Sequence, residues 1–330
     1  MSKSQAGRPT PRPRTGFSLV ELLVVVLIIA LLIGILLPAL GAVRERAQRA
    51  KDTTQLRNIV QGLEVWAGNN DGDYPLPSAL DRDSTTVATS ESYQKDNSGN
   101  IWSVMIWNGV VPTEALVNPA EVNANIGQDE AYQFETPEKA VDPSRAVFDP
   151  GFAGVPFESG TGTGTGGRRL GAGGDVVGGT SYASIIPFGP RQGQWRATSD
   201  KARPLVADRG PEYMGVAGNW SLRAGATGTN SNTLRIFGLS NRWRGNVAWT
   251  DGRVDFFTRP DPSPQMTRTF PGASGTGLAD NIFVNENDDN GFLSMEQNPG
   301  QNDNTLLRPF SDVQAGGSSR RDARVTTFID

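Results

Sequence analysis

Cysteine and histidine are both absent from this chain of 330 residues. Without cysteine there is no disulfide framework and no thiolate chemistry. Without histidine the commonest general base and the commonest metal ligand are missing, which excludes a Ser-His-Asp triad and histidine-bearing zinc sites. The sequence also shows no nucleophile paired with a base, no convincing phosphate-binding loop and no cluster of metal ligands. We therefore expect that the protein is not an enzyme.

Apolar residues are scarce as well, at 37% of the chain, whereas there are 39 glycines and 22 prolines. This composition favours a loop-rich fold that leans towards β-structure. Residues 1–16 hold four basic and no acidic side chains, so the net charge of −4 leaves −8 on the remainder. An acidic body argues against nucleic acid as a partner.

One segment, in contrast, is almost entirely apolar. Residues 17–40 read FSLVELLVVVLIIALLIGILLPAL, and Glu21 is the only charge among them. As a helix this segment reaches about 36 Å, enough to cross a bilayer core of about 30 Å. A core helix would keep an amphipathic stripe, and the apolar region of a secretory signal is shorter, about 7–15 residues. The segment predicts a transmembrane helix, and the basic residues before it favour a cytoplasmic leader.

Glu21 needs a partner, because a charge at mid-membrane costs about 2.5–3.5 kcal/mol. One interpretation is local. Ser18 and Glu21 have the spacing of a capping box, and an acid in the first turn suits the helix dipole. The other interpretation is functional pairing with a second chain, and the two interpretations are compatible.

The stretch Gly16-Phe17-Ser18-Leu19-Val20-Glu21, between a short basic leader and a long apolar helix, resembles the class III signal of type IV prepilins and pseudopilins. The resemblance covers about residues 12–50. It implies cleavage by a prepilin peptidase between Gly16 and Phe17, N-methylation of Phe17, and pairing of Glu21 with the amino terminus of a neighbouring subunit during assembly.

The resemblance also implies partners and a location. The partners are the prepilin peptidase, other pseudopilins, the inner-membrane assembly platform and membrane lipid. The protein is expected to be single-pass in the inner (cytoplasmic) membrane, with a cytoplasmic leader and a periplasmic or other extracytoplasmic body. The implied function is that of a structural subunit of a type II secretion or type IV pilus-like filament.

Beyond the apolar run, apolar residues at a spacing of three to four predict that the helix continues to Ala67, with Gly68 as the residue that ends it. The expected fold is α+β and pilin-like: a long N-terminal membrane-spanning helix packed on a loop-rich antiparallel β-sheet domain. The expected parts are a leader (1–16), a transmembrane helix (17–40), its extension (41–68) and a β-rich extracytoplasmic domain (69–330) with a Gly/Thr-rich loop at 159–179.

Short strand patterns separated by Gly and Pro indicate the antiparallel sheet. They fall at 181–186, 204–207, 234–239, 246–249, 253–258, 282–284 and 324–329, while residues 101–111 fit a short helix or a strand. The sequence Thr250-Asp251-Gly252 predicts a hairpin turn between two of these strands.

Residues 245–256 resemble the carboxy-terminal signature of a large bacterial pseudopilin-like family: a His, nine residues, then Asp-Gly before a hydrophobic strand. The signature residues here are Asn246, Asp251 and Gly252. The chain departs from it at Asn241, which stands where the family has the His. A metal or hydrogen-bonding role of that His is therefore not implied here, whereas the hairpin is.

A second interpretation is a membrane-anchored binding module that uses the helix only as a tether and recognises a polymer or calcium. Glu286, Asp288 and Asn290 have the first spacings of a calcium loop, but Gln297 stands where its last acidic ligand belongs. Solvated acidic turns explain these residues, and also Asp71 and Asp73, more simply. We expect no cofactor, with calcium as the alternative. Stacking on sugars is the corresponding alternative to a core role for Trp195, Trp220, Trp243 and Trp249.

Overall fold

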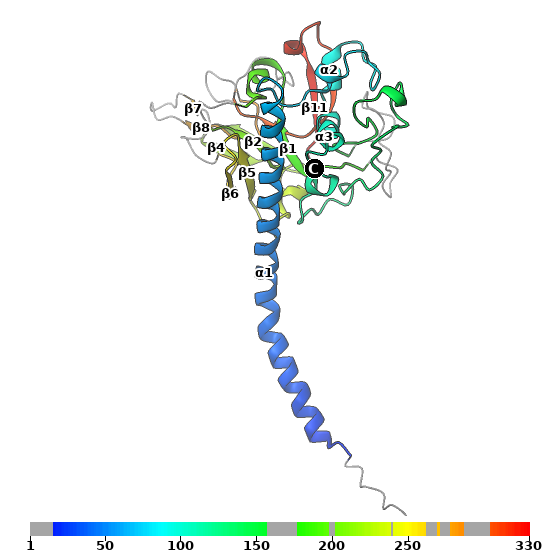
Figure 1. Cartoon of the computed structure of the whole chain (residues 1–330). Coiled ribbons are helices and arrows are strands. Elements are labelled where there is room, and N and C mark those ends of the chain that lie inside the picture. Colours follow the sequence, from blue (N-terminus) through cyan, green and yellow to red (C-terminus); the bar gives the residue numbers. More distant parts are fainter. Residues whose placement is uncertain are drawn as a thin grey trace, which may run out of the picture. The chain divides into compact units, whose positions relative to one another are not determined.

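The longest element of the computed structural model is helix α1, Leu19–Gly68, drawn in blue in Figure 1. The structure describes residues 16–156, 177–197, 202–238, 240–261, 269–270, 278–286 and 304–330. The chain divides into two units, residues 1–46 and 47–330, and α1 contributes to both. The prediction of one continuous helix is confirmed.

The end of α1 differs from the prediction in one detail. Gly68 is the last helical residue and does not adopt the left-handed conformation expected of a terminating glycine. The left-handed positions come later, at Asp71 (φ 55°) and Gly72 (φ 82°). The amide of Gly72 donates to the carbonyl of Ala67 at 2.9 Å, so the chain reverses three residues further on than the sequence indicated.

The second unit is built around a five-stranded antiparallel sheet with the order β6-β5-β2-β1-β9. Every residue of β1, β2 and β5 is buried. Because both faces of these central strands are covered, their sequences read as apolar runs rather than as alternating patterns. The strands are β1 (Tyr182–Ile185), β2 (Pro204–Asp208), β5 (Gly245–Trp249), β6 (Val254–Phe257) and β9 (Leu307–Arg308).

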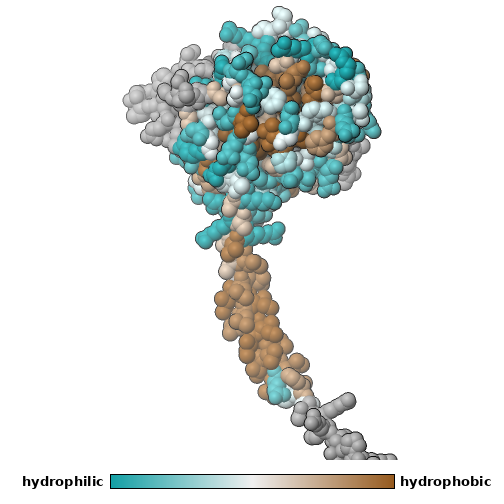
Figure 2. All heavy atoms as spheres, viewed as in Figure 1, coloured by the Kyte–Doolittle hydropathy of each residue, from teal (hydrophilic) through white to brown (hydrophobic). Residues whose placement is uncertain are grey.

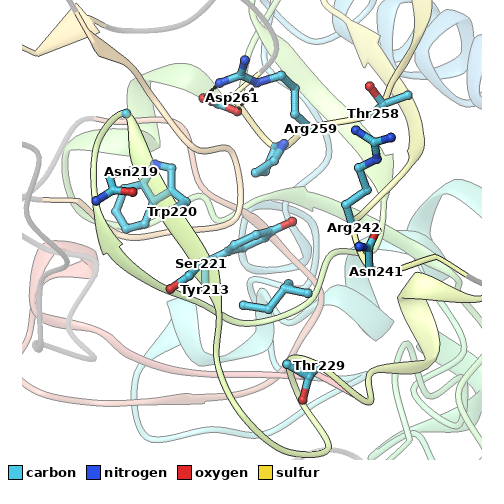
Figure 3. A pocket seen from close by; sticks show the side chains of 13 residues that line it. Tyr213, Asn219, Trp220, Ser221, Thr229, Asn241, Arg242, Thr258, Arg259 and Asp261 are labelled. Atoms are coloured by element: carbon cyan, nitrogen blue, oxygen red, sulfur yellow. Dashed lines mark hydrogen bonds and ion pairs between the residues drawn. The ribbon is translucent and has the colours of Figure 1, made fainter.

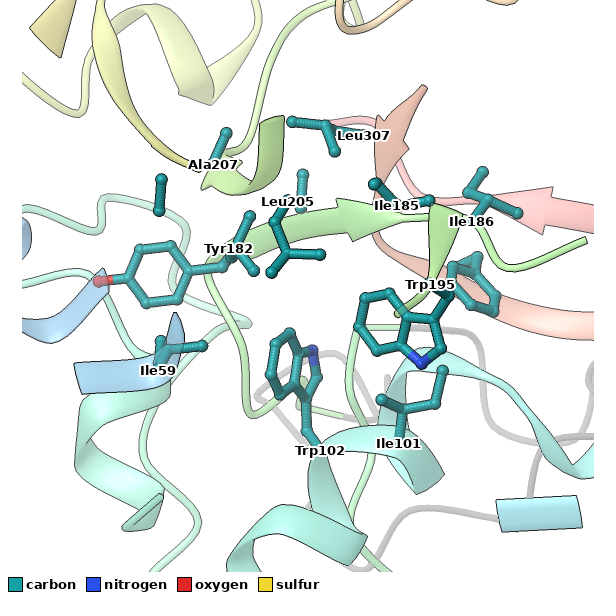
Figure 4. Close-up of a cluster of buried hydrophobic side chains, with 14 of the residues drawn as sticks. Ile59, Ile101, Trp102, Tyr182, Ile185, Ile186, Trp195, Leu205, Ala207 and Leu307 are labelled. Carbon is teal, nitrogen blue, oxygen red and sulfur yellow. The ribbon is translucent and has the colours of Figure 1, made fainter. Parts of the chain in front are cut away.

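The carboxy-terminal half of α1 packs into the core of this second unit. Leu56, Ile59 and Leu63 are fully buried there. Helix α3, Ser98–Trp107, is capped by the preceding residue Asn97, whose side chain accepts the amide of Asn100 at 2.9 Å. Figure 4 shows Ile59 of α1 and Trp102 of α3 close to the side chains of the sheet. The sheet, α1 and α3 therefore share one core, and the fold is α+β as predicted.

Shorter elements surround the core. Three two-stranded ribbons pair β3 with β4, β7 with β8, and β10 with β11. Their bounds are β3 (Tyr213–Val216), β4 (Asn219–Leu222), β7 (Thr269–Phe270), β8 (Leu278–Ala279), β10 (Phe310–Gln314) and β11 (Arg324–Thr327). The remaining helices of the described residues are α2 (Pro77–Leu80) and the 3-10 helices η1 (Ser92–Lys95), η2 (Thr113–Leu116), η3 (Pro143–Arg145), η4 (Gly189–Gln194), η5 (Asn232–Leu234) and η6 (Arg320–Asp322).

Five of the predicted strands are present, as β1, β2, β5, β6 and β11, and residues 101–111 begin as helix rather than strand. Two predicted strands are wrong. Leu234 ends the 3-10 helix η5 and residues 235–237 form a turn, because the Ser231 side chain caps the amide of Thr233 and starts a helical turn. Residues 282–284 form a turn, in which the Asn281 side chain accepts the amide of Phe283 at 3.0 Å. Leu239 lies outside the described residues.

The Gly/Thr-rich segment 159–179 is described only at residues 177–179. There Gly178 forms a parallel β-bridge with Ile126. A Cβ on Gly178 would lie 2.6–2.7 Å from Pro156 and Val155, so the chain passes too close to its neighbour for a larger residue. The rest of the expected loop lies outside the described residues.

Candidate functional site

The start of α1 places three predicted residues together. Gly16 has no atom within 4 Å of where a Cβ would stand, and Phe17 is 79% exposed. The Ser18 amide donates to Glu21 Oε2 at 2.9 Å, and the Val20 amide donates to Ser18 Oγ at 3.2 Å. Glu21 therefore caps its own helix in the arrangement that its spacing predicted. The Gly16–Phe17 peptide bond lies open directly before this capped end.

The next two dozen residues of α1 are apolar all the way round. The large apolar side chains from Leu19 to Leu40 are each 45% or more exposed, and Glu21 is the only charged residue among them. Figure 2 shows this segment brown along its visible face. Within the described residues, α1 is the one helix long and apolar enough to span a membrane, judged by length and composition.

Five buried polar side chains connect α1 to the sheet: Asp52 on α1, Asn118, Tyr182 on β1, Asp208 on β2 and Asn246 on β5. We call them the anchor cluster. Asp52 Oδ1 accepts the Tyr182 hydroxyl at 2.7 Å and the Asn118 amide at 3.0 Å, and Asp52 Oδ2 accepts the Asn246 side-chain amide. Asp208 accepts the Asn118 side-chain amide and the Asn246 backbone amide, both at 2.6 Å.

Burial raises the pKa of both acids of the anchor cluster. Loss of solvation raises the pKa of Asp52 from 3.8 to about 6, against the lowering effect of the hydrogen bonds from Asn246 and Tyr182. Loss of solvation and the adjacent charge of Asp52 raise the pKa of Asp208 well above 3.8. Two neighbouring buried carboxyl groups cannot both ionise at low cost. Because neither side chain reaches solvent, the pair serves the packing of α1 on the sheet.

The sequence contains a signal for part of this cluster. Asp52 precedes Leu56 by four residues and Ile59 by seven, so it lies on the buried stripe of the helix. An acid in that position needs buried partners. The partners themselves come from β1, β2, β5 and the segment at Asn118, which no spacing along the chain brings together.

The hairpin predicted at Thr250-Asp251-Gly252 is present between β5 and β6. β5 and β6 pair in antiparallel register from Gly245 with Phe257 to Ala248 with Val254. Gly252 takes a φ of 79°, its amide donates to the Trp249 carbonyl at 2.9 Å, and Asp251 accepts the Arg253 amide at 3.1 Å.

The signature asparagines lie in different places. Asn246 is buried in the anchor cluster, whereas Asn241 is exposed at the rim of a pocket. The structure therefore does not bring these two residues into one site.

Of the three calcium candidates in the acidic loop, the structure describes only Glu286. Glu286 is fully buried, and its carboxyl accepts the Asn281 amide at 3.0 Å and the Asn304 side chain at 2.9 Å. Burial and the adjacent Asp280 raise the pKa of Glu286 to about 11. Asp288 and Asn290 lie outside the described residues. Among the described residues no group of three or more acidic side chains is arranged to hold a metal ion.

The other calcium pair, Asp71 and Asp73, follows the end of α1. Asp73 pairs with Arg196 at 3.5 Å, and the guanidinium of the same arginine donates to the Asp71 carbonyl oxygen at 3.2 Å. The arginine is thus the cation that this turn contacts.

Of the four tryptophans considered for sugar stacking, three belong to the core. Trp195, Trp243 and Trp249 are at most 2% exposed. Trp220 is half-buried on β4 and lines the same pocket as Asn241.

Residues 11–37 match the family described as the prokaryotic N-terminal methylation motif. Comparison with curated proteins and with solved structures finds no match to the chain. The matched segment contains the Gly16–Phe17 junction, Glu21 and most of the apolar run. This motif is that of type IV pilin-like precursors, which are structural proteins. The chain carries their prepilin-type amino-terminal signature, and the signature with its apolar helix indicates membrane anchoring.

Proposed function

We propose that this protein is a pseudopilin-like structural subunit of a type II secretion or type IV pilus-like filament. A prepilin peptidase cuts it after Gly16, and the new amino group of Phe17 is methylated. The observation that carries the proposal is the matched methylation motif at residues 11–37, with an exposed Gly16–Phe17 junction directly before a capped apolar helix.

The proposed arrangement assigns a task to each part of the chain. Residues 1–16 are the cytoplasmic leader, 17–40 cross the inner membrane once, 41–68 extend the helix, and 69–330 form the extracytoplasmic domain. The apolar segment 17–40 first contacts lipid and then packs against the same segment of other pseudopilins on the assembly platform. The anchor cluster holds α1 to its own domain while this exchange occurs.

Glu21 has two tasks in this proposal. Before cleavage it accepts the Ser18 amide and caps the helix. In the assembled filament its carboxylate pairs with the methylated amino group of Phe17 on a neighbouring subunit. The carboxylate therefore has a charge partner when it is buried between apolar helices.

The first experiment is the intact mass and amino-terminal peptide of the protein from native membranes. A chain that begins at Phe17 and carries one extra methyl group is expected. A chain that keeps residues 1–16, or that is cut elsewhere, contradicts the proposal and favours a membrane-anchored binding module that uses the helix only as a tether.

Three variants then separate the two tasks of Glu21. Glu21→Gln keeps an oxygen that can accept the Ser18 amide but removes the charge, and Glu21→Val removes both. Both are expected to be membrane-inserted and to fail to enter filaments, whereas Glu135→Val, at an exposed acid of the body, assembles normally. If Glu21→Gln enters filaments as efficiently as the parent, the charge of Glu21 is not needed for assembly and its role is limited to helix capping.

A further inference from the structure

The body carries a pocket of about 620 Å³ that the proposed filament function does not use. One wall is the β3–β4 hairpin with Tyr213 and Trp220, and the facing wall comes from residues 241–242 and 258–261. The volume lies within the range of about 300–1,000 Å³ typical of small-molecule sites. The pocket thus has the size of a ligand site and is built from two separate segments.

The hairpin wall supplies two aromatic rings. In the register of β3 and β4, Tyr213 lies opposite Leu222 and Gly215 lies opposite Trp220. Gly215 has a φ of 122°, and a Cβ there would lie 2.4 Å from the Asn219 carbonyl oxygen. The residue paired with Trp220 therefore has no side chain to cover the indole ring. Aromatic surface beside polar groups suits a ligand that has both apolar and polar faces.

The facing wall supplies positive charge. Arg259 is bound on Asp261, with its Nε donating at 2.8 Å, and this pair is internally neutral. Arg242 is exposed, and its guanidinium makes no ion pair or hydrogen bond with the part of the chain that the structure describes. Figure 3 shows Trp220 on one side of the pocket and Arg242 on the other. In a chain of net charge −4, the pocket offers an unpaired cation opposite an aromatic ring.

Neutral hydrogen-bonding groups complete the lining. Asn219, Asn241 and Thr258 are exposed, and within the described residues none of their side chains is engaged in a hydrogen bond. Amides and hydroxyls of this kind bind hydroxyl groups in either direction. A fatty acid would leave them unpaired, at a cost for each group that the ligand buries.

We propose that this pocket binds a sugar carrying a carboxylate, of the uronic acid class. The Arg242 guanidinium receives the carboxylate in a two-pronged pair, the Trp220 ring lies against the apolar face of the sugar, and the neutral side chains bind its hydroxyl groups. The site contains Asn241, the residue that stands in place of the signature His. The proposal is independent of filament assembly, because none of its residues lies on α1.

The test uses the full chain in detergent and isothermal titration calorimetry with three probes: tetragalacturonic acid, neutral galactotetraose and tetraglutamate. The acidic sugar is expected to bind at least tenfold more tightly than the neutral sugar, and the peptide is expected not to bind. The preference should shrink in high salt, because an exposed charge pair is screened.

Variants assign the binding to this pocket. Arg242→Ala is expected to lower the affinity for the acidic sugar roughly tenfold or more, while the affinity for the neutral sugar stays the same. Arg242→Lys should recover part of the loss, and Trp220→Ala should weaken both sugars. Arg235→Ala, at an exposed arginine outside the pocket, is the matched control.

Three results would overturn the proposal: no binding of the acidic sugar, equal binding of the two sugars, or equal effects of Arg242→Ala and Arg235→Ala. Tighter binding of tetraglutamate would assign the pocket to an acidic peptide instead. Thermal unfolding of each variant separates lost binding from lost folding. The melting temperatures of Arg242→Ala and Arg235→Ala are expected to match that of the parent. Filament content of the same variants reports separately on the proposed function.

Discussion

Asp52 of α1 and Asp208 of β2 bring two buried carboxyl groups to one donor, the side-chain amide of Asn118, at 3.0 Å and 2.6 Å. Burial raises the pKa of both acids, so the folded chain takes up protons that the unfolded chain releases. The helix and the sheet are thus joined by a contact whose strength depends on pH.

The direction of this dependence follows from the raised pKa values. Between pH 4 and about pH 6 the folded state binds more protons at Asp52 than the unfolded state, so the free energy of unfolding falls as pH rises. The raised pKa of Asp208 contributes to the fall in the same direction. Asp52→Asn is expected to remove part of this slope, on the order of 2–3 kcal/mol across the range. Urea unfolding of the full chain at several pH values measures it.

The control for this slope is Asp83→Asn, at an acid that is 75% exposed. The pH dependence of the free energy of unfolding should be the same in Asp83→Asn as in the parent. Asp96, another buried acid with a raised pKa, contributes to this pH dependence in every one of these proteins. An unchanged slope in Asp52→Asn would mean that Asp52 is ionised in the folded chain throughout this range.

Asn246 and Asn241 should differ strongly in how much stability their truncation to alanine removes. Asn246→Ala removes the donor to Asp52 and the acceptor of the Thr53 hydroxyl, and leaves a buried carboxylate oxygen unpaired. We expect a loss of about 2–3 kcal/mol in the free energy of unfolding. Asn241→Ala, at an exposed side chain, should stay within about 0.5 kcal/mol of the parent. Equal losses in the two variants would contradict the placement of Asn246 in the anchor cluster.

Gly252 should tolerate no side chain without cost. It has a φ of 79° in the β5–β6 turn, although no atom lies within 4 Å of an added Cβ. Gly252→Ala is expected to cost about 1 kcal/mol through backbone strain alone, since there is no clash. Gly193→Ala, also without a neighbour within 4 Å but not in the left-handed region, is the control. Thermal unfolding should separate the two variants, and equal melting temperatures would argue against strain at the turn.

Lys95 should be far more sensitive than an exposed cation. Its side chain is 1% exposed and pairs with the fully buried Asp81 at 2.9 Å. Lys95→Met leaves that carboxylate without its charge partner and is expected to cost about 3–5 kcal/mol. Arg145→Met, which breaks the exposed pair with Asp83, should cost at most about 1 kcal/mol.

The double variant Lys95→Met with Asp81→Asn completes this comparison. It should recover part of the loss, because the uncompensated charge is gone. Denaturation of the parent, Lys95→Met, Asp81→Asn and the double variant gives the coupling free energy between Lys95 and Asp81. A coupling no larger than that expected for an exposed pair would show that the buried charges are solvated.

Several elements were predictable because their signals are local. The hairpin at Asp251-Gly252 needs only a turn residue that accepts a positive φ between two strand-forming runs. Helix α3 and the strands β1, β2 and β5 are apolar runs bounded by breakers. The β3–β4 hairpin was missed because Met214 and Gly215 are exposed and Gly218 and Asn219 read as loop. The predicted strands at 234–239 and 282–284 failed because the side chains of Ser231 and Asn281 hold turns there.

The sequence by itself determined the amino-terminal part of this protein. The Gly16–Phe17 junction, the cap formed by Ser18 and Glu21, and the apolar run are contiguous, and their chemistry depends on lipid and on neighbours along the helix. The tertiary structure alone decided the anchor cluster and the pocket beside Arg242. Each gathers side chains from segments far apart in the chain, and burial, which depends on the whole fold, determines whether an acid such as Asp52 carries a charge.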